Sequence, residues 1–313
     1  LLLILITYLP ISIMGQYELP QYDIKIKLIT TEKILKVTQT IEYRNGTPKA
    51  LKTLYLNDWS HAYSSSKSPL AQRFAEEYDR RFYLGSKAKR GETSELKIFI
   101  NNKEINWFRQ KNQLDIIGIY LSEDLMVDEQ IKIRLSYNIE MPDARYTGYG
   151  MVSEKEFYLK NCFIQIAPFI DGKWITNSNL DLEETSTLPA NFSLEWDVPI
   201  HLNVNSNLTQ WKVSKTKDRK LISQSISKAK EIQFHISEKE YSYFSINGLK
   251  IGTDFKKVTE DKFDPTPSLI KIESFVRGRF GAFPQNKMLL SEFDYKKRTY
   301  FGLSSIPSIF YPF

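Results

Sequence analysis

The sequence predicts a mostly β protein, with a large antiparallel β sandwich or saddle followed by the start of an α/β domain. Alternating apolar and polar residues run through most of the first 250 positions, and turn residues separate the alternating segments. After Asp261 the spacing of apolar residues becomes helical. Aromatic residues make up 13% of the 313 residues, which favours strands over helices. Many half-buried strands joined by turns are typical of antiparallel sheets packed face to face.

The strand pattern is clearest in "YDIKIKLI", where Tyr22, Ile24, Ile26 and Leu28 alternate with charged residues. This alternation predicts one buried and one wet face. Residues 34–46 repeat it and end in the tight-turn pair Asn45-Gly46. The segments 131–139 and 192–198 show the same alternation, with Pro199 closing the second. Segments 221–227 and 231–236 are predicted to form a hairpin after a Lys-rich turn.

One helix is predicted within the β region. Ser68 can cap it, Pro69 suits its first position, and Gly85 is a plausible end. Its apolar face recurs every four residues, at Leu70, Phe74, Tyr78 and Phe82. No residue pattern for chemistry is visible in this segment.

A second helix is predicted after Asp261, with Pro267 and Ser268 at its start. Its apolar face consists of Leu269, Ile272, Val276 and Phe280. The segment "KMLLSEFDY" then predicts a strand. The last fifty residues thus follow the order strand, helix, strand and turn. They look like the opening of an α/β domain that has too few elements for a core of its own. We expect the domain boundary between Lys250 and Asp264, with a β domain over 16–255 and an incomplete domain over 256–313.

The run Leu1–Met14 is apolar, is interrupted by Pro10 and is too short to span a bilayer. It resembles the apolar region of a secretory signal, with cleavage after Gly15, so 1–15 is predicted to be a partial signal peptide. A buried N-terminal strand is the alternative. The signal predicts a secreted, periplasmic or cell-envelope protein with no stable membrane span after cleavage. Cys162 is the only cysteine, so no internal disulfide can form, and we expect it to be buried and inert.

The net charge of +6 is spread along the chain, and its densest basic runs, 87–90 and 212–220, lie in turn-like sequence. Without a recognition motif, this distribution predicts no nucleic-acid partner. The three histidines, His61, His201 and His235, form no H-E-x-x-H, and each is expected to be a surface or satisfied core residue. There is also no glycine-rich phosphate loop and no G-x-S-x-G. The visible residues therefore make no complete active site.

The order of four stretches resembles the front part of the aminopeptidase N-like zinc metallopeptidases, the gluzincin aminopeptidases. The first stretch is 22–63, with paired strands and a turn before a Leu-rich strand. The second is "NCFIQIAPFIDGKW", similar to a family strand that ends in Gln before an apolar-Pro turn. The third is "ANFSLEWDVPIHLNVNSN", and the fourth is 270–307, which resembles the segment that leads into the family's Gly-x-Met-Glu-Asn motif. The resemblance covers most of residues 17–313.

The resemblance implies a saddle-like β domain followed by a thermolysin-like catalytic domain. In the family, zinc is held by H-E-x-x-H and a later Glu, and a zinc-polarised water attacks the peptide carbonyl. The chain would then be the N-terminal fragment of a secreted aminopeptidase that acts on peptides. Zinc is expected in the full-length protein, while this chain lacks matches to the zinc ligands and is expected to bind none.

Only a few substrate-binding residues carry over by resemblance, and no catalytic residue does. Gln165 matches the β-domain Gln that helps to hold the substrate amine. Gly302 matches the Gly of Gly-x-Met-Glu-Asn, and Leu303 replaces the Met. Ser304 and Ser305 stand in place of Glu and Asn, and a Ser hydroxyl cannot supply the negative charge that pairs with an ammonium.

Two alternatives to an active peptidase remain. The Ser304-Ser305 departure favours a family relative that has lost catalysis and serves as an extracellular or envelope binding or scaffold protein. The second alternative is an unrelated extracellular adhesion or sugar-binding module. Trp59, Trp107, Trp174 and Tyr149 could stack on sugars if exposed, although core packing is the commoner role of each.

Overall fold

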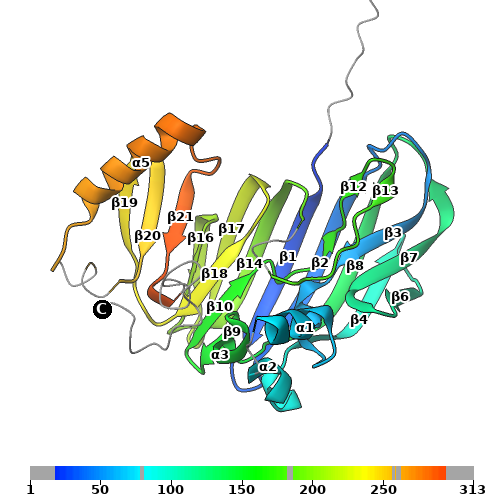
Figure 1. The fold of residues 1–313 in the computed structure, drawn as a ribbon, viewed down its shortest axis with the longest axis horizontal. Coiled ribbons are helices and arrows are strands. Elements are labelled where there is room, and N and C mark those ends of the chain that lie inside the picture. Colours follow the sequence, from blue (N-terminus) through cyan, green and yellow to red (C-terminus); the bar gives the residue numbers. More distant parts are fainter. Residues whose placement is uncertain (1–17, 78–80, 182–185, 256–257, 259–261, 294–313) are drawn as a thin grey trace, which may run out of the picture.

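The computed structural model describes residues 18–77, 81–181, 186–255, 258 and 262–293, and Figure 1 shows their arrangement. The described part is mostly β, as predicted, with several antiparallel sheets. The proposed signal peptide and Gly302, Leu303 and Ser304 lie outside these residues. No helix in the described ranges is long and apolar enough to cross a membrane.

The largest sheet has eight strands in the order β16-β17-β14-β1-β2-β8-β4-β5. Its strands are β1 (Gln21–Ile29), β2 (Ile34–Arg44), β4 (Glu92–Ile100), β5 (Lys103–Glu104), β8 (Gln130–Glu140), β14 (Ala190–Pro199), β16 (Thr209–Lys215) and β17 (Arg219–Ala229). All neighbours in it are antiparallel except β1 and β14, which are parallel. The sheet forms the broad middle of the molecule (Figure 1).

Two four-stranded sheets accompany it. One has the order β15-β18-β10-β9, with β9 (Gly150–Ser153), β10 (Glu156–Lys160), β15 (Asn203–Ser206) and β18 (Gln233–Ser237). The other has the order β11-β3-β7-β6, with β3 (Leu51–Asn57), β6 (Trp107–Gln110), β7 (Gln113–Leu125) and β11 (Gln165–Ile166). A two-stranded ribbon joins β12 (Phe169–Ile170) to β13 (Lys173–Trp174). One large apolar cluster takes residues from all three main sheets, so they share a core.

The predicted alternation explains this core. Tyr22, Ile24, Ile26 and Leu28 of β1 are all at most 2% exposed, while the charged residues between them are exposed. In β14, Phe192, Leu194, Trp196 and Val198 are buried in the same way. In β8, residues 133–139 follow the pattern, and Ile131 at the strand's start is half-buried. Cys162 is buried as predicted, and burial raises the pKa of its thiol to about 12.

One predicted hairpin is wrong, and the turn pair Asn45-Gly46 does not join two paired strands. After this turn the chain changes sheet, because β2 pairs with β1 and β8 while β3 pairs with β7 and β11. Asn45 is fully buried, and its Nδ2 donates to the carbonyls of Lys49, Leu125 and Met126 as the chain crosses between sheets. The segments 221–227 and 231–236 are also in different sheets. The hairpin through the Lys-rich turn is instead β16–β17.

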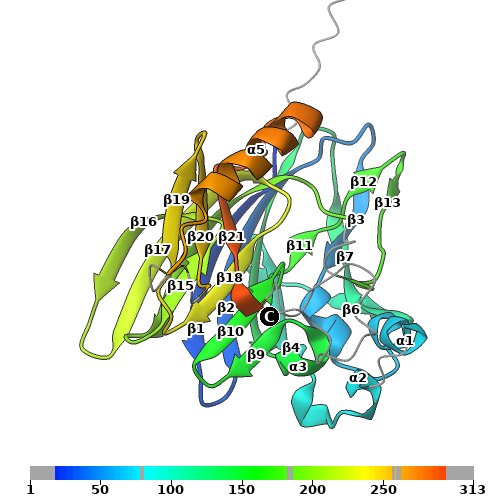
Figure 2. The same cartoon turned by 60° about the vertical axis from the view of Figure 1, so that its left-hand side comes forward.

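The predicted first helix forms as two short pieces, α1 (Pro69–Glu76) and α2 (Arg81–Leu84). Ser68 caps α1 as predicted, since its side chain accepts a hydrogen bond from the Ala71 N–H. Leu70 and Phe82 are buried, and Phe74 packs against them. The 3₁₀ segments η1 (Trp59–Tyr63) and η2 (Lys87–Lys89) precede and follow this region in the chain, and the short helix α3 (Ala144–Thr147) contacts α2 (Figure 2).

A three-stranded sheet contains β19 (Ser242–Ile246), β20 (Leu249–Thr253) and β21 (Lys287–Leu290), and α5 (Thr266–Phe280) lies along it (Figures 1 and 2). Here β20 and β21 are parallel neighbours, as in a β-α-β unit. A small apolar cluster of Ile246, Leu249 and Ile251 packs with Leu269 and Met288. Strands on both sides of the predicted domain boundary therefore share one sheet, and the boundary itself stays a prediction.

The amphipathic face predicted for α5 is only partly buried. Leu269 packs on the sheet, but Ile272 is 59% and Phe280 is 82% exposed. The buried residue of this helix is Glu273, whose carboxylate accepts hydrogen bonds from Asn247 and Arg277 at 2.5 Å. The helix therefore contacts the loop between β19 and β20 through a polar side chain. Much of its apolar face is not covered by the described residues.

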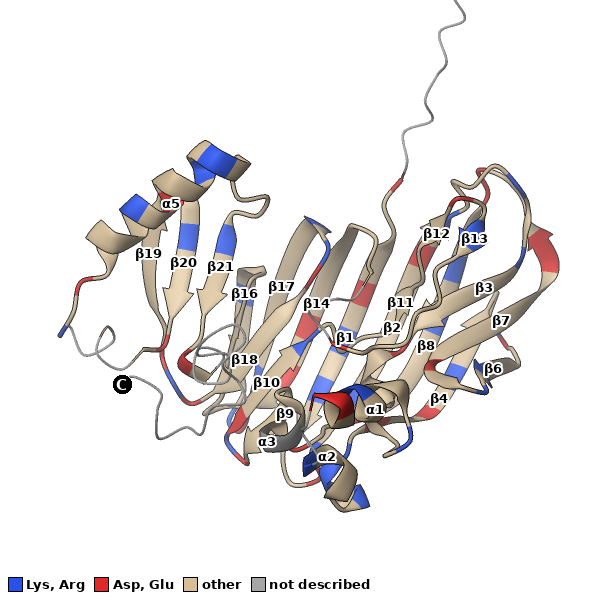
Figure 3. Cartoon of the chain, viewed as in Figure 1, with Lys and Arg blue, Asp and Glu red and all other residues tan. Residues whose placement is uncertain are grey.

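Charged residues of both signs are interspersed along the strands and helices in Figure 3, in line with the spread seen in the sequence. The residues offered for sugar stacking are largely packed. Trp59 and Tyr149 are buried, and Trp107 and Trp174 are half-buried against the core.

Candidate functional site

Gln165 lies in the two-residue strand β11, which pairs with the end of β3 so that Gln165 is opposite Asn57. Paired residues in antiparallel strands project to the same face, so both amides lie on one side of the sheet. Gln165 is 3% exposed, and its Nε2 has no hydrogen-bond partner among the described residues. The Oδ1 of Asn57 is also buried and has no hydrogen-bond partner among the described residues. Since an unpaired buried polar atom is costly, this pair of amides is unusual for a purely structural strand.

Buried polar side chains of the eight-stranded sheet hold β11 in place. The Nε2 of Gln39 donates to the Ile164 carbonyl at 2.6 Å, and the Tyr137 hydroxyl donates to the Oε1 of Gln39 at 2.5 Å. The Ile166 N–H donates to the Tyr22 hydroxyl at 3.0 Å. Burial raises the pKa of the Tyr137 hydroxyl well above its ordinary value, so this hydroxyl stays a donor. The segment that carries Gln165 is thus positioned by contacts with the core.

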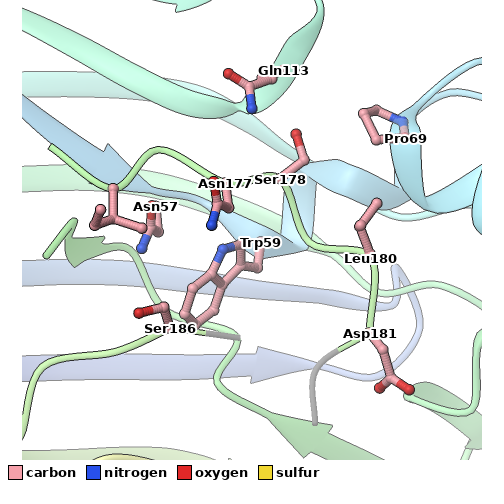
Figure 4. Close-up of a pocket in the computed structure, with 10 residues that line it drawn as sticks. Asn57, Trp59, Pro69, Gln113, Asn177, Ser178, Leu180, Asp181 and Ser186 are labelled. Carbon is pink, nitrogen blue, oxygen red and sulfur yellow. The ribbon is translucent and has the colours of Figure 1, made fainter. Parts of the chain in front are cut away.

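A pocket of about 340 Å³ lies beside this strand pair (Figure 4). The residues that line it are Asn57, Trp59, Pro69, Gln113, Ile175, Asn177, Ser178, Leu180, Asp181 and Ser186. Figure 4 shows the Trp59 indole in the middle of the pocket, near Asn177 and Asn57. The indole Nε1 is buried and has no partner in the described ranges. The pocket is lined by several side-chain amides, groups suited to a neutral polar ligand such as a peptide backbone.

The loop on one side of the pocket is held by a buried carboxylate. Asp115 of β7 accepts hydrogen bonds from the Ser178 hydroxyl at 2.8 Å and from the Asn179 N–H at 2.6 Å. Burial raises the pKa of Asp115, and these two hydrogen bonds oppose the rise. The Nε2 of Gln113 also donates to the Thr176 carbonyl at 2.7 Å. Residues 176–179 are therefore fixed to the strand that faces the pocket.

The 3₁₀ segment that carries Trp59 is anchored by an ion pair. Arg109 of β6 reaches the Oδ2 of Asp58 at 2.7 Å, and the side chain of Asp58 is fully buried. The Thr93 hydroxyl donates to the other carboxylate oxygen at 2.6 Å. His61 also bonds to the Thr93 backbone. Burial, followed by the charge of Arg109, lowers the pKa of His61, so its predicted role as a satisfied core histidine fits.

The pocket has no chemistry of its own for bond cleavage. Among its lining residues, Asp181 is the single carboxylate, and there is no His, Cys or Lys. Gly302, Leu303 and Ser304, the other predicted substrate-binding residues, lie outside the described residues, so their relation to Gln165 stays a prediction. Of the pocket residues, Trp59 was named from the sequence only as a candidate for sugar stacking, and Asn57 and Asn177 were not singled out. No local motif marks them, because they meet only after the strands pair.

A second cluster was also missed. Glu156, His235 and Asp254 offer ligand atoms that all lie within 4.8 Å of one another. No local pattern marks this cluster, because the three residues are far apart in the chain and share no metal-binding spacing.

No protein-family model matches the chain, and no curated protein matches it in sequence. Solved structures do match its fold. An M1 zinc metallopeptidase from Deinococcus radiodurans matches with a TM-score of 0.50, and a variant of it with a bound Tyr-Ser-Ala substrate matches with 0.53. In both cases the identity is 12%, and the match covers 88% of this chain and 56% of the other. The chain thus spans little more than half the length of these structures, and it shares the fold of the N-terminal part of M1 zinc metallopeptidases.

Proposed function

We propose that this chain is the front part of a secreted, periplasmic or envelope zinc metallopeptidase that removes N-terminal residues from peptides. The observation that carries the proposal is the pair of unsatisfied buried amides, Gln165 and Asn57, beside a pocket in a β domain with the fold of M1 zinc metallopeptidases. In this proposal Gln165 helps to hold the peptide's free amine, and the neighbouring pocket residues contact its backbone. The proposed location outside the cytoplasm rests on the resemblance of residues 1–15 to an export signal.

The zinc would be supplied with its ligands by sequence beyond these 313 residues. When bound there, zinc would supply the polarisation of water that peptide hydrolysis needs, as the resemblance implies. The described residues of this chain would serve binding: they would orient the N-terminus of the peptide and provide one wall of the site. Gly302, Leu303 and Ser304 would lie at the amine end of the peptide, with Ser304 weakening the amine clamp because it carries no charge.

The reading frame of the full-length protein tests this first. We expect an H-E-x-x-H on a helix and a Glu on the next helix. A continuation that lacks both would remove the peptidase proposal, whatever the β domain binds.

A second candidate is a catalytically inactive relative that binds peptides or serves as a scaffold. Ser304-Ser305 in place of Glu-Asn favours it. The two candidates differ in turnover: the inactive relative would bind a peptide with a free N-terminus and release it unchanged. Equilibrium binding of a labelled tripeptide, measured together with product formation by mass spectrometry, separates them.

A further inference from the structure

Glu156, His235 and Asp254 come from two different sheets. Glu156 begins β10 and His235 lies in the neighbouring strand β18, where Tyr158 pairs with His235 and Glu156 pairs with Ser237. Glu156 and His235 are therefore diagonal neighbours on one face. Asp254 directly follows β20 of the three-stranded sheet. The cluster thus lies where the sheet of β10 and β18 meets the unit that contains α5.

The two carboxylates face the two different ring nitrogens of His235, so an ion would take one of these nitrogens together with both carboxylates. The Nε2 of His235 is 2.9 Å from the Oε1 of Glu156, and its Nδ1 is 3.5 Å from the Oδ2 of Asp254. The side chains of His235 and Asp254 are fully buried, and that of Glu156 is 19% exposed. One imidazole nitrogen with two carboxylate oxygens is a ligand set that zinc and similar first-row cations accept.

Asp254 is the second, independent sign of a missing positive group. Its Oδ1 accepts a hydrogen bond from the Glu292 N–H at 2.7 Å, which orients the carboxylate. Its Oδ2 points into the cluster and accepts no hydrogen bond from any residue in the described ranges. A fully buried carboxylate oxygen without a donor is costly, so the arrangement favours a cation at this point.

Lys239 shows that a cation is accepted there. Its Nζ lies 2.8 Å from the Oε1 of Glu156 and 3.6 Å from the Oδ2 of Asp254, between the two carboxylates. Its side chain is 44% exposed, so it can swing into solvent without crossing the core. The hydrogen bond from His235, followed by that from Lys239, lowers the pKa of Glu156 to about 2, against the effect of burial. The two carboxylates thus share one ammonium.

We propose that Glu156, His235 and Asp254 bind one first-row divalent cation of the zinc type, which displaces the ammonium of Lys239. The Tyr241 hydroxyl, 2.6 Å from the Nδ1 of His235, is the other polar group that contacts the imidazole. The ion ties β10 and β18 to the end of β20, so its effect is on the junction between the two sheets. The proposal concerns residues of this chain alone, and it stands whether or not the full-length protein is a peptidase.

Calorimetric titration of the metal-free chain with zinc chloride tests the proposal. One equivalent is expected to bind, and the Tm is expected to rise with zinc concentration, because an ion that binds only the folded state stabilises it by mass action. Asp254→Asn keeps the shape of the side chain but removes its charge, and His235→Ala removes the imidazole. Both variants are expected to weaken zinc binding by at least about 100-fold. Removing a residue that only supports a metal ligand already weakens metal binding by up to about this factor. His201→Ala, at an exposed histidine, is the matched control and should bind like the parent.

Lys239→Met separates a metal site from a simple ion-pair network. If the ammonium competes with the metal, this variant binds zinc several-fold more tightly than the parent. Circular dichroism establishes that each variant is folded before its affinity is compared. The proposal is overturned if the parent takes up no zinc, if Asp254→Asn and His235→Ala leave the affinity unchanged, or if Lys239→Met weakens zinc binding.

Discussion

Gln165 and Asn57 are directly opposite each other on β11 and β3, and each has one buried amide atom without a hydrogen-bond partner in the described residues. Burying such atoms costs free energy that an apolar side chain would not cost. Asn57 also lines the pocket. The pair of strands that carries these two amides is therefore better suited to bind a ligand than to stabilise the fold. This relationship leads to the first prediction.

Gln165→Leu should change peptide selectivity more than stability. Its Nε2 has no partner to lose, so we expect the free energy of unfolding to change by less than about 1 kcal/mol. In the full-length protein, kcat/KM for a peptide with a free N-terminus should fall by about tenfold, which corresponds to one hydrogen bond to a charged group. Hydrolysis of free and N-acetylated peptides measures this. Gln130→Leu, at an exposed position of β8, is the control, and an equal loss on both peptides would argue against an amine contact.

Gln39→Leu should destabilise the fold strongly. It leaves the Ile164 carbonyl without its donor and the Tyr137 hydroxyl without its acceptor, both of them buried. At about 1–3 kcal/mol for each unsatisfied group, the loss from the two groups should be about 2–6 kcal/mol in urea unfolding. Thr38→Val, on the exposed face of the same strand, should stay close to the parent. A variant as stable as the parent would show that these bonds do not hold β11.

Arg109→Met should also be costly, because it leaves the fully buried Asp58 carboxylate without its positive partner. Removing one member of a buried pair typically costs about 3–5 kcal/mol. The double variant Asp58→Asn, Arg109→Met should recover part of this loss, because no buried charge remains. The exposed pair Lys132–Glu42 is the comparison, and Lys132→Met should cost less than about 1 kcal/mol. Equal losses at both pairs in a double-mutant cycle would contradict the anchoring role of Asp58.

Lys287 should make stability rise with pH. Burial, followed by the charge of Lys250, lowers its pKa to about 8 from an ordinary value of 10.5. Between these two values the unfolded chain binds more protons than the folded one, so the free energy of unfolding increases as pH increases. Lys287→Met should remove this slope. Lys250→Met should move it to higher pH, since the repelling charge that faces Lys287 across β20 and β21 is gone. Urea unfolding at intervals from pH 7.5 to about 10.5 measures both.

Strands with a period of two were predictable because the pattern is local. Tyr22 to Leu28 and Phe192 to Val198 show their buried face in the sequence itself. The pairing of strands was not predictable in this way, so the predicted hairpin of 221–227 with 231–236 was wrong. Gln39 illustrates the limit: it is a polar residue on an apolar face, and its partner Ile164 is 125 residues away. No local spacing could indicate that bond.

The candidate sites divide in the same way. Gln165 was found by resemblance, because a short stretch of chain carries it. The pocket around Trp59 and the cluster of Glu156, His235 and Asp254 depend on which strands meet, so they became visible only in three dimensions. For helix α5 the local pattern predicted the element but not which of its residues would be buried. Its apolar spacing was read correctly as helical, but the sequence could not show that Glu273 would be its buried residue.

Hydrolysis of an aminoacyl-anilide and its N-acetylated counterpart by the full-length protein tests the central claim most directly. The assay is run on the parent and on Asp254→Asn, so that zinc at the Glu156, His235 and Asp254 cluster cannot account for the result. The account predicts turnover of the free substrate alone in both proteins, loss of turnover with a chelator and recovery with zinc. Absence of turnover in the zinc-loaded, folded protein, or equal cleavage of the acetylated substrate, would contradict it.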